Sequence, residues 1–136
     1  MKKLVTVYGS LLSGLGNWSW CLKRPDCELK GEHVLEIPVR MLSLGGFPGL
    51  IETEEKNKIL VETYEVPEEV YRNIERLEGY RGESNKDFNM YNKMAVETPF
   101  GPSEIYIYNS RNVYAADRFV PKDKDGVISW RKYRQK

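Results

Sequence analysis

VTVYGSLLSGLGN, residues 5–17, combines an apolar run with a glycine-containing turn. The apolar run, which ends at Tyr8, predicts a buried strand. The strand breaks at Gly9 and Ser10, and a loop with two further glycines follows. Because glycine adopts conformations closed to other residues, such a turn can point several backbone N–H groups into open space. The segment therefore predicts a site for an anion or a developing oxyanion, with an ordinary strand-to-loop corner as the alternative.

Length and composition favour one globular domain that functions inside the cell. The chain has 136 residues, of which 40% are hydrophobic and 30% are charged, a balance typical of folded rather than disordered proteins. No apolar run approaches the roughly 20 residues that cross a membrane, and the short run after Lys3 does not resemble a signal peptide. Cys21 and Cys27 form no disulfide framework, so we expect a reduced, cytoplasmic protein.

The charge distribution divides the chain near residue 110. The net charge of +1 gives no overall electrostatic footprint for nucleic acid, but residues 111–136 are locally basic. We expect a domain over residues 1–110 and a basic C-terminal extension over 111–136, part of the same domain or packed on it, solvated and partly flexible. A nucleic-acid binder that uses this extension and Trp130 would lose affinity steeply with salt, and the sequence does not favour that function.

Strands dominate the predicted elements, and one long helix stands among them. Besides the strand that ends at Tyr8, a short helix is expected over 17–23, and further strands over 27–37, 39–44, 58–66, 90–98 and 104–108. The main helix is expected to begin at Pro67 and to stop at Gly79. This order predicts an α+β fold, a closed or nearly closed sheet with the helix packed on it.

Glu78 occupies an unusual place on the main helix. It follows Ile74 by four residues and Val70 by eight, so it shares their apolar stripe at the last turn. One interpretation is that the carboxylate swings into water or pairs with Arg76 or Arg81. The other is a half-buried carboxylate at the negative end of the helix dipole, where burial and dipole both raise its pKa toward values useful for proton transfer.

Other common chemistries are poorly supported by the residues present. His33 is the one histidine, and with Cys21 and Cys27 it does not match zinc-ligand spacing. A catalytic triad would need His33, which is expected mid-strand without an obvious partner, so Ser10 is a weak nucleophile candidate. We therefore expect chemistry that uses one carboxylate and a set of backbone donors, without metal or cofactor.

Several separated segments resemble the γ-glutamylcyclotransferase-like family, in the branch of γ-glutamylamine cyclotransferases and AIG2-like proteins. The similarity covers residues 4–108 in the same order, and the turn YGSL and the helix end LEGY are its most specific parts. Its segments are VYGSLLSGLGN, LGGFPGLIE, VETYEVPEEVYRNIERLEGY, a tyrosine strand and SEIYIYN.

The resemblance implies a small mixed β-barrel with flanking helices, and it implies roles for named residues. The pocket turn that holds the α-amino acid end of a γ-glutamyl group corresponds to four consecutive residues, namely Tyr8, Gly9, Ser10 and Leu11. The acid/base corresponds to Glu78, and Tyr91 is a further expected substrate contact. Two departures affect the expected substrate, namely Val61 where relatives usually have glycine, and Lys93 where the motif Tyr-x-Arg usually has arginine.

Together these observations predict an enzyme that cyclises a γ-glutamyl group to 5-oxoproline, with Glu78 as general acid/base and no cofactor. The expected partner is a small γ-glutamyl molecule, with neither membrane nor nucleic acid. The leaving amine or amino acid and the oligomeric state are left open. The alternative is a non-catalytic module that uses the same pocket to bind a small ligand or a protein, because a borrowed fold need not keep its activity.

Overall fold

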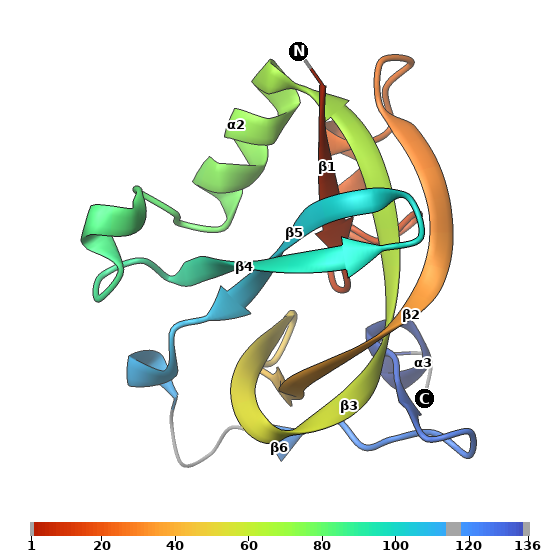
Figure 1. The fold of residues 1–136 in the computed structure, drawn as a ribbon, viewed down its shortest axis with the longest axis vertical. Coiled ribbons are helices and arrows are strands. Elements are labelled where there is room, and N and C mark those ends of the chain that lie inside the picture. Colours follow the sequence, from red (N-terminus) through yellow and green to blue (C-terminus); the bar gives the residue numbers. More distant parts are fainter. Residues whose placement is uncertain (1, 114–117, 135–136) are drawn as a thin grey trace.

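A strongly curved sheet forms the centre of the computed structural model, which describes residues 2–113 and 118–134 (Figure 1). Its strands are β1 (Lys2–Val7), β2 (Glu28–Ser43), β3 (Pro48–Pro67), β4 (Tyr91–Thr98), β5 (Gly101–Tyr108), β6 (Arg118–Phe119) and β7 (Val127–Ile128). Their order is β4-β5-β1-β3-β2-β6, and β7 pairs with β3. Pairs β1–β5 and β3–β7 are parallel and the others are antiparallel, so the sheet is mixed.

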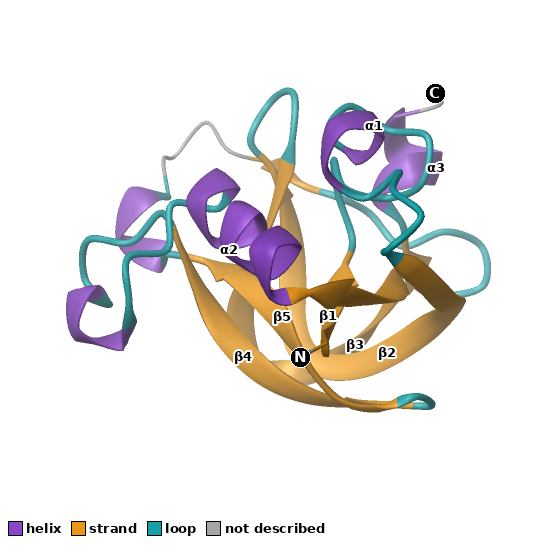
Figure 2. Cartoon of the chain, turned by 90° about the horizontal axis from the view of Figure 1, so that it is seen from above, coloured by secondary structure: helices purple, strands orange, loops and turns teal. Residues whose placement is uncertain are grey.

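Helices cover one part of this sheet and its ends. They are α1 (Trp18–Cys21), α2 (Glu68–Leu77) and α3 (Trp130–Arg134), with short 3₁₀ turns η1 (Glu83–Asn85) and η2 (Ser110–Asn112). Viewed from above, α2 lies over the sheet beside β1, β4 and β5 (Figure 2). The predicted α+β class is confirmed, as a curled mixed sheet that forms a half-barrel with one main helix packed on it.

The long antiparallel pair β2–β3 differs from the elements expected from the sequence. Two strands were expected on either side of Pro38, but β2 runs through it with a register irregularity between Ile37 and Val39. Proline lacks the N–H of a ladder bond, which explains a local break in pairing rather than the end of the strand. The expectation that the next strand begins at Lys58 is also wrong, because β3 begins at Pro48.

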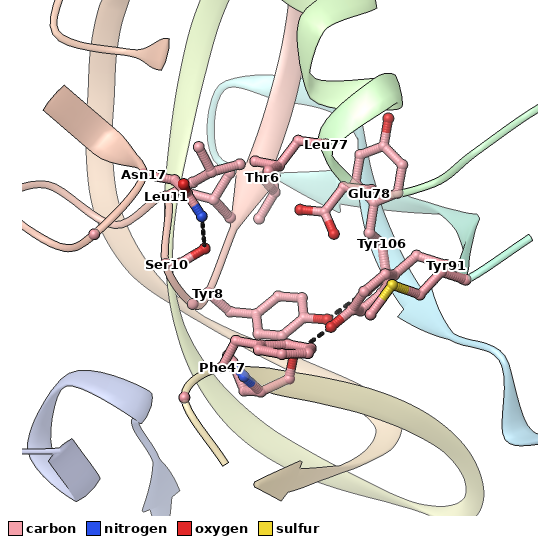
Figure 3. A pocket seen from close by; sticks show the side chains of 16 residues that line it. Thr6, Tyr8, Ser10, Leu11, Asn17, Phe47, Leu77, Glu78, Tyr91 and Tyr106 are labelled. Atoms are coloured by element: carbon pink, nitrogen blue, oxygen red, sulfur yellow. Dashed lines mark hydrogen bonds between the residues drawn. The ribbon is translucent and has the colours of Figure 1, made fainter. Parts of the chain in front are cut away.

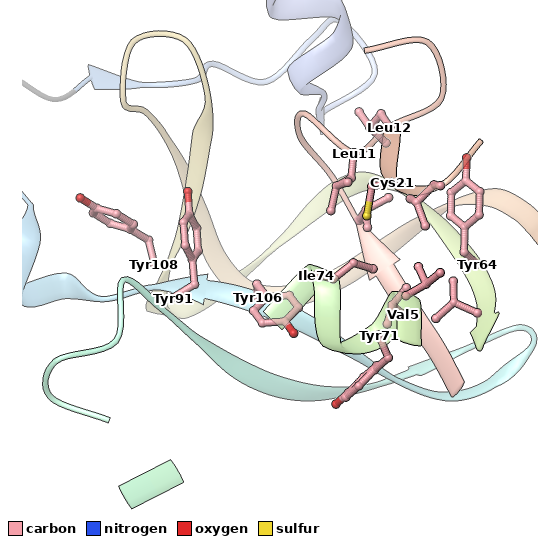
Figure 4. Close-up of a cluster of buried hydrophobic side chains, with 14 residues drawn as sticks. Val5, Leu11, Leu12, Cys21, Tyr64, Tyr71, Ile74, Tyr91, Tyr106 and Tyr108 are labelled. Carbon is pink, nitrogen blue, oxygen red and sulfur yellow. The ribbon is translucent and has the colours of Figure 1, made fainter. Parts of the chain in front are cut away.

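Two apolar clusters stabilise the two faces of the sheet. One lies between α2 and the sheet, where Val70 and Ile74 are fully buried against Val5 and Val66 (Figure 4). The second fills the curl of the sheet and includes Leu50. Burial of the predicted helix stripe at Val70 and Ile74 is confirmed, and the C-terminal end of that stripe carries Glu78 to the edge of the first cluster.

A chain of hydroxyl groups links neighbouring strands of the sheet. The Thr6 Oγ1 atom lies 2.9 Å from both Thr63 Oγ1 and Ser103 Oγ. His33 Nε2 lies 2.7 Å from Thr63 Oγ1, and burial lowers the pKa of this imidazole. His33 therefore has a partner inside the sheet, and that partner is Thr63 rather than Ser10.

The C-terminal segment contributes to the fold at several described positions. Strand β6 pairs with β2, β7 pairs with β3, and Val120, Ile128 and Trp130 are buried in the second cluster. Trp130 is 2% exposed. The expectation of a solvated extension is therefore wrong for these three residues. Residues 114–117 and 135–136 of the extension lie outside the described part of the chain.

Candidate active site

A cavity of about 480 Å³ opens between the end of β1, the segment before β3 and the C-terminal end of α2 (Figure 3). Its walls are mostly apolar or neutral. Among the lining residues, Glu78 alone has a carboxyl, amine or guanidinium group. The lining residues are Thr6, Val7, Tyr8, Gly9, Ser10, Leu11, Gly16, Asn17, Gly46, Phe47, Pro48, Leu77, Glu78, Met90, Tyr91 and Tyr106.

Backbone hydrogen bonds fix the position of the Glu78 backbone at the end of α2. Glu78 is the C-terminal cap of α2, and its N–H donates to the Ile74 carbonyl at 2.9 Å. Gly79 then turns the chain with a φ of 66°, a conformation that favours glycine. Two further bonds, Tyr91 N–H to Glu78 O and Met90 N–H to Gly79 O, both 3.2 Å, close the loop of residues 80–89 at its base.

The carboxylate of Glu78 points into the cavity, across from Ser10 and Asn17 (Figure 3). Burial raises its pKa from 4.5 to about 7. Within residues 2–113 and 118–134, no side chain donates a hydrogen bond to it, and Arg76 instead donates to Asn73 at 2.7 Å. A carboxyl group with a pKa near neutrality can both take up and return a proton.

Close packing requires glycine at the start of the pocket turn. A Cβ atom on Gly9 would lie 2.6 Å from Pro48 Cγ and 2.8 Å from its Cδ. The two segments of the resemblance, YGSL and LGGFPGLIE, therefore meet at this point, where backbone and proline ring approach each other. Such an approach leaves no space for a larger residue at position 9.

The Ser10 hydroxyl is oriented by an amide that the sequence did not single out for the site. Asn17 Nδ2 donates to Ser10 Oγ at 2.8 Å, and the Trp20 indole N–H donates to Asn17 Oδ1 at 2.9 Å. Since an indole nitrogen can only donate, it fixes which end of the Asn17 amide faces Ser10. The Ser10 hydroxyl accepts this bond, which leaves its own proton for an acceptor in the cavity.

Asn17 is the first residue of the short helix that the sequence predicts over residues 17–23. It occupies the N-cap position of α1, but its side chain makes no capping bond there. The amide is used at the cavity instead. Asn17 ends the segment VYGSLLSGLGN of the resemblance. Its spacing from Ser10 does not predict their contact, which depends on the conformation of the loop between them.

The expected contacts Tyr8 and Leu11 both line the cavity. Leu11 is 3% exposed and belongs to the apolar cluster under α2. The hydroxyl of Tyr8 donates to the Tyr106 carbonyl at 2.8 Å and accepts from the Leu50 N–H at 3.3 Å. Burial also raises the pKa of Tyr8 well above its usual range. Tyr8 therefore presents its ring to the cavity, while its hydroxyl joins three strands.

Tyr91 and Tyr106 form another wall of the cavity. The Tyr91 hydroxyl donates to the Pro48 carbonyl at 2.6 Å, and its ring contacts Tyr108 edge-on. Burial raises the pKa of Tyr91, and the charge of Glu78 raises it further. The buried hydroxyl of Tyr106 has no hydrogen-bond partner among the described residues. Tyr106 lies in the segment SEIYIYN noted in the sequence, but nothing there separated it from Tyr108.

The cavity brings all six predicted site residues together, and it adds neutral groups that the sequence did not identify. Among residues 2–113 and 118–134, no three His, Cys, Asp or Glu side chains gather as possible ligands of one metal ion. In the same part of the chain, no helix is long and apolar enough to cross a membrane. The arrangement offers one tunable carboxyl group and several neutral hydrogen-bond donors.

Comparison with known proteins identifies relatives across most of the chain. Residues 5–132 match the family model described as gamma-glutamyl cyclotransferase, AIG2-like. A protein of Vibrio cholerae described as "Putative gamma-glutamylcyclotransferase" is 32% identical over 108 residues, which are 79% of this chain and 84% of that protein.

Solved structures with lower identity share the fold. A protein specific to uropathogenic E. coli superposes with a TM-score of 0.73 at 17% identity, over 99% of this chain and 97% of that one. An uncharacterized protein of Pyrococcus horikoshii gives 0.66 at 24% identity, covering 98% and 93%. A mouse AIG2-like protein gives 0.57 at 17% identity, covering 84% and 80%. The chain belongs to the AIG2-like family of gamma-glutamyl cyclotransferases.

Proposed function

We propose that this protein cyclises a γ-glutamyl group to 5-oxoproline and releases the attached amine or amino acid. The single observation that carries the proposal is the Glu78 carboxylate, which points into the cavity with a pKa near 7. Family membership supports cyclotransferase chemistry in general, and the site geometry supports the specific role of Glu78. The free thiols of Cys21 and Cys27 are compatible with the cytoplasmic location that we propose.

In the proposed reaction, the ionised Glu78 takes one proton from the α-ammonium group of the substrate. The freed nitrogen forms a bond to the substrate's own γ-carbonyl carbon, and a five-membered ring with a tetrahedral oxyanion results. Glu78 returns this proton to the leaving nitrogen as the bond between that nitrogen and the γ-carbon breaks. The ring nitrogen gives up its second proton, through the same carboxylate, to the released amine, which departs as an ammonium ion and leaves neutral 5-oxoproline lactam. Because the attack is intramolecular, the site need only fold the substrate and exclude water.

The turn of residues 9–11 is proposed to hold the oxyanion and the amino acid end of the substrate. Ser10 and Leu11 line the cavity across from Glu78 (Figure 3), and the backbone N–H groups of this turn are the proposed donors. The Ser10 hydroxyl is available as a further donor because it accepts from Asn17. Each donor to a developing oxyanion contributes about a hundredfold to a thousandfold to the rate. Neutral donors suit this task because they leave the pKa of Glu78 near neutrality.

The test is Glu78→Gln, assayed with a panel of γ-glutamyl amino acids, γ-glutamyl amines and γ-glutamyl-ε-lysine for release of 5-oxoproline. We expect a folded protein that binds substrate but turns it over about a hundredfold to ten-thousandfold more slowly, the usual effect of removing an acid/base. Glu54→Gln, which changes an exposed glutamate on β3, is the matched control and should be fully active. Undiminished turnover by Glu78→Gln would exclude Glu78 from the mechanism.

A non-catalytic binding module is the second candidate. The observation that favours it is the position of Lys93, which stands where the family motif usually has arginine and lies outside the cavity lining. The ammonium group of Lys93 contacts the Glu75 carboxylate and the Tyr71 hydroxyl, and Lys93 does not line the cavity. A cation at this position is therefore engaged by α2 rather than by a ligand. If the unmodified protein binds γ-glutamyl compounds but releases no 5-oxoproline from any of them, the binding function replaces the enzymatic one.

A further inference from the structure

A buried carboxylate of the sheet, that of Glu62, binds the loop of residues 9–17, which we call the pocket loop. Glu62 lies in β3 opposite Val7, the last residue of β1, and is 3% exposed. Its Oε1 atom accepts the backbone N–H of Ser13 at 2.8 Å, and its Oε2 atom accepts the Ser13 hydroxyl at 2.8 Å. Both oxygens thus bind the same residue, three positions after Ser10, with charge-assisted bonds that are stronger than neutral ones.

The C-terminal helix supplies the positive charge that accompanies this carboxylate. Arg131 Nη2 lies 3.3 Å from Glu62 Oε2 and 3.3 Å from Ser13 Oγ. On the other side, the Tyr64 hydroxyl donates to Glu62 Oε1 at 3.2 Å and accepts the Trp18 indole N–H at 3.0 Å. A carboxylate removed from water requires such partners. The network therefore joins β3, the pocket loop, α1 and α3.

Backbone hydrogen bonds within the pocket loop hold its residues in one arrangement. Leu12 N–H donates to the Gly9 carbonyl at 2.9 Å, and Asn17 N–H donates to the Ser10 carbonyl at 2.8 Å. Ser13 lies between these two bonds. The two hydrogen bonds from Ser13 to Glu62 therefore hold the whole loop, including Ser10 and Asn17, in place relative to the sheet.

From this geometry we infer that Glu62, paired with Arg131, is a positioning residue for the substrate-binding turn. The inference rests on the proposed function, because it assigns to the network the placement of the turn that receives the γ-glutamyl group. Neither side chain lines the cavity, so neither is a catalytic residue. The basic end of the chain thereby serves the site through Arg131 rather than through a nucleic-acid partner.

The test measures the dissociation constant of 5-oxoproline, the product common to every γ-glutamyl substrate, by NMR titration. Glu62→Gln and Arg131→Met should each weaken binding about tenfold, since each removes a charge-assisted contact. Glutamine has one acceptor oxygen, and its NH₂ group would face the Arg131 donor. Arg131→Lys should restore part of the affinity. Lys132→Met removes a neighbouring charge of the same helix, which pairs with Asp123, and should bind like the unmodified protein.

Hydrogen exchange on the same samples separates positioning from general stability. Amides of residues 10–17 should exchange faster in Glu62→Gln and Arg131→Met, while amides of β1 and β5 keep their protection. If Glu62→Gln does not fold, Ser13→Ala removes one of the two bonds and keeps the backbone bond, with a smaller effect in the same direction.

Two results would overturn the inference. One is wild-type affinity for 5-oxoproline in folded Glu62→Gln and Arg131→Met proteins, whether or not their loops exchange faster. The other is a uniform loss of protection over loop and sheet together. Failure of the proposed function is recognised separately, in the unmodified protein, as absence of 5-oxoproline release. An unmodified protein that also fails to bind 5-oxoproline would contradict both.

Discussion

At the scale of single residues, the energetics of the site centre on Glu78. A glutamate on the stripe of Val70 and Ile74 loses hydration when the helix packs, and no described side chain compensates its charge. Burial of Glu78 at the cavity therefore destabilises the ionised form of its carboxyl group. Such a cost is typical of groups kept for chemistry rather than for stability.

The raised pKa of Glu78 predicts a pH-dependent stability. The folded protein holds this proton up to a pH of about 7, but the unfolded chain releases it near 4.5. Stability from this group is therefore complete below pH 4.5 and is lost as the pH rises through 7, a total of about 3 kcal/mol at about 1.4 kcal/mol per pH unit. Glu78→Gln should lack this loss, as urea unfolding at pH 5 and pH 8 would reveal.

Comparison of the unmodified protein with Glu78→Gln separates the contribution of Glu78 from that of the other titrating side chains. Glu54→Gln should follow the unmodified protein at both pH values. The same pKa places the acidic limb of the kcat/KM profile near pH 7, since the free enzyme needs the ionised base. Parallel stability curves for the unmodified protein and Glu78→Gln would contradict the raised pKa.

How far the site residues could be predicted depends on how local their signals are. Helical spacing placed Glu78 on the stripe of Ile74 and Val70, about one and two turns before it, and the family resemblance supplied its expected role. Glu62 and Ser13 could not be paired in this way. Their contact spans 49 positions and depends on the register of β1 against β3, which no local pattern in either segment specifies.

At the scale of elements, the end of α2 determines where the acid lies. Gly79 has a φ of 66°, and a Cβ atom there would lie 3.0 Å from Met90 Cβ. The sequence predicted this stop correctly, because glycine after a helical stripe is a common C-terminal signal. Strand ends were harder to predict, as Pro38 shows, because a bulge and a strand terminus use the same residue types.

Gly79→Ala should destabilise the protein by about 1–2 kcal/mol, the usual cost of a left-handed conformation with a side chain. The crowded contact with Met90 should also displace the helix end and lower kcat. Gly126→Ala is the control. It carries a similar positive φ, 77°, but a Cβ atom there meets nothing within 4 Å. Urea unfolding and steady-state rates are the measurements. Equal loss of activity in both variants would contradict the role given to the contact with Met90.

At the scale of the whole molecule, the C-terminal segment closes the curled sheet. Sparse apolar residues among many charges predicted a solvated extension there. Long-range packing overrides that composition, because Val120, Ile128 and Trp130 fill the second cluster. A few buried side chains separated by polar ones leave no periodic signal in so short a segment.

Trp130→Ala should lower the free energy of unfolding by about 3–5 kcal/mol, since it leaves a large cavity in a packed core. The control is Phe88→Ala, which removes an aromatic ring that is 87% exposed and should change stability by no more than about 0.5 kcal/mol. Thermal or urea unfolding distinguishes the two. Equal, small effects would mean that the C-terminal segment does not stabilise the sheet.

The pair of backbone bonds that closes residues 80–89 at their base has an evolutionary consequence. The bonds join Gly79 to Met90 and Glu78 to Tyr91, the residues that flank the segment, so the backbone of Glu78 is held independently of the side chains inside the segment. We therefore expect relatives to differ within this segment, which leads directly into the cavity residues Met90 and Tyr91. If the proposed function holds, changes there alter which leaving group is accepted while Glu78 keeps its role.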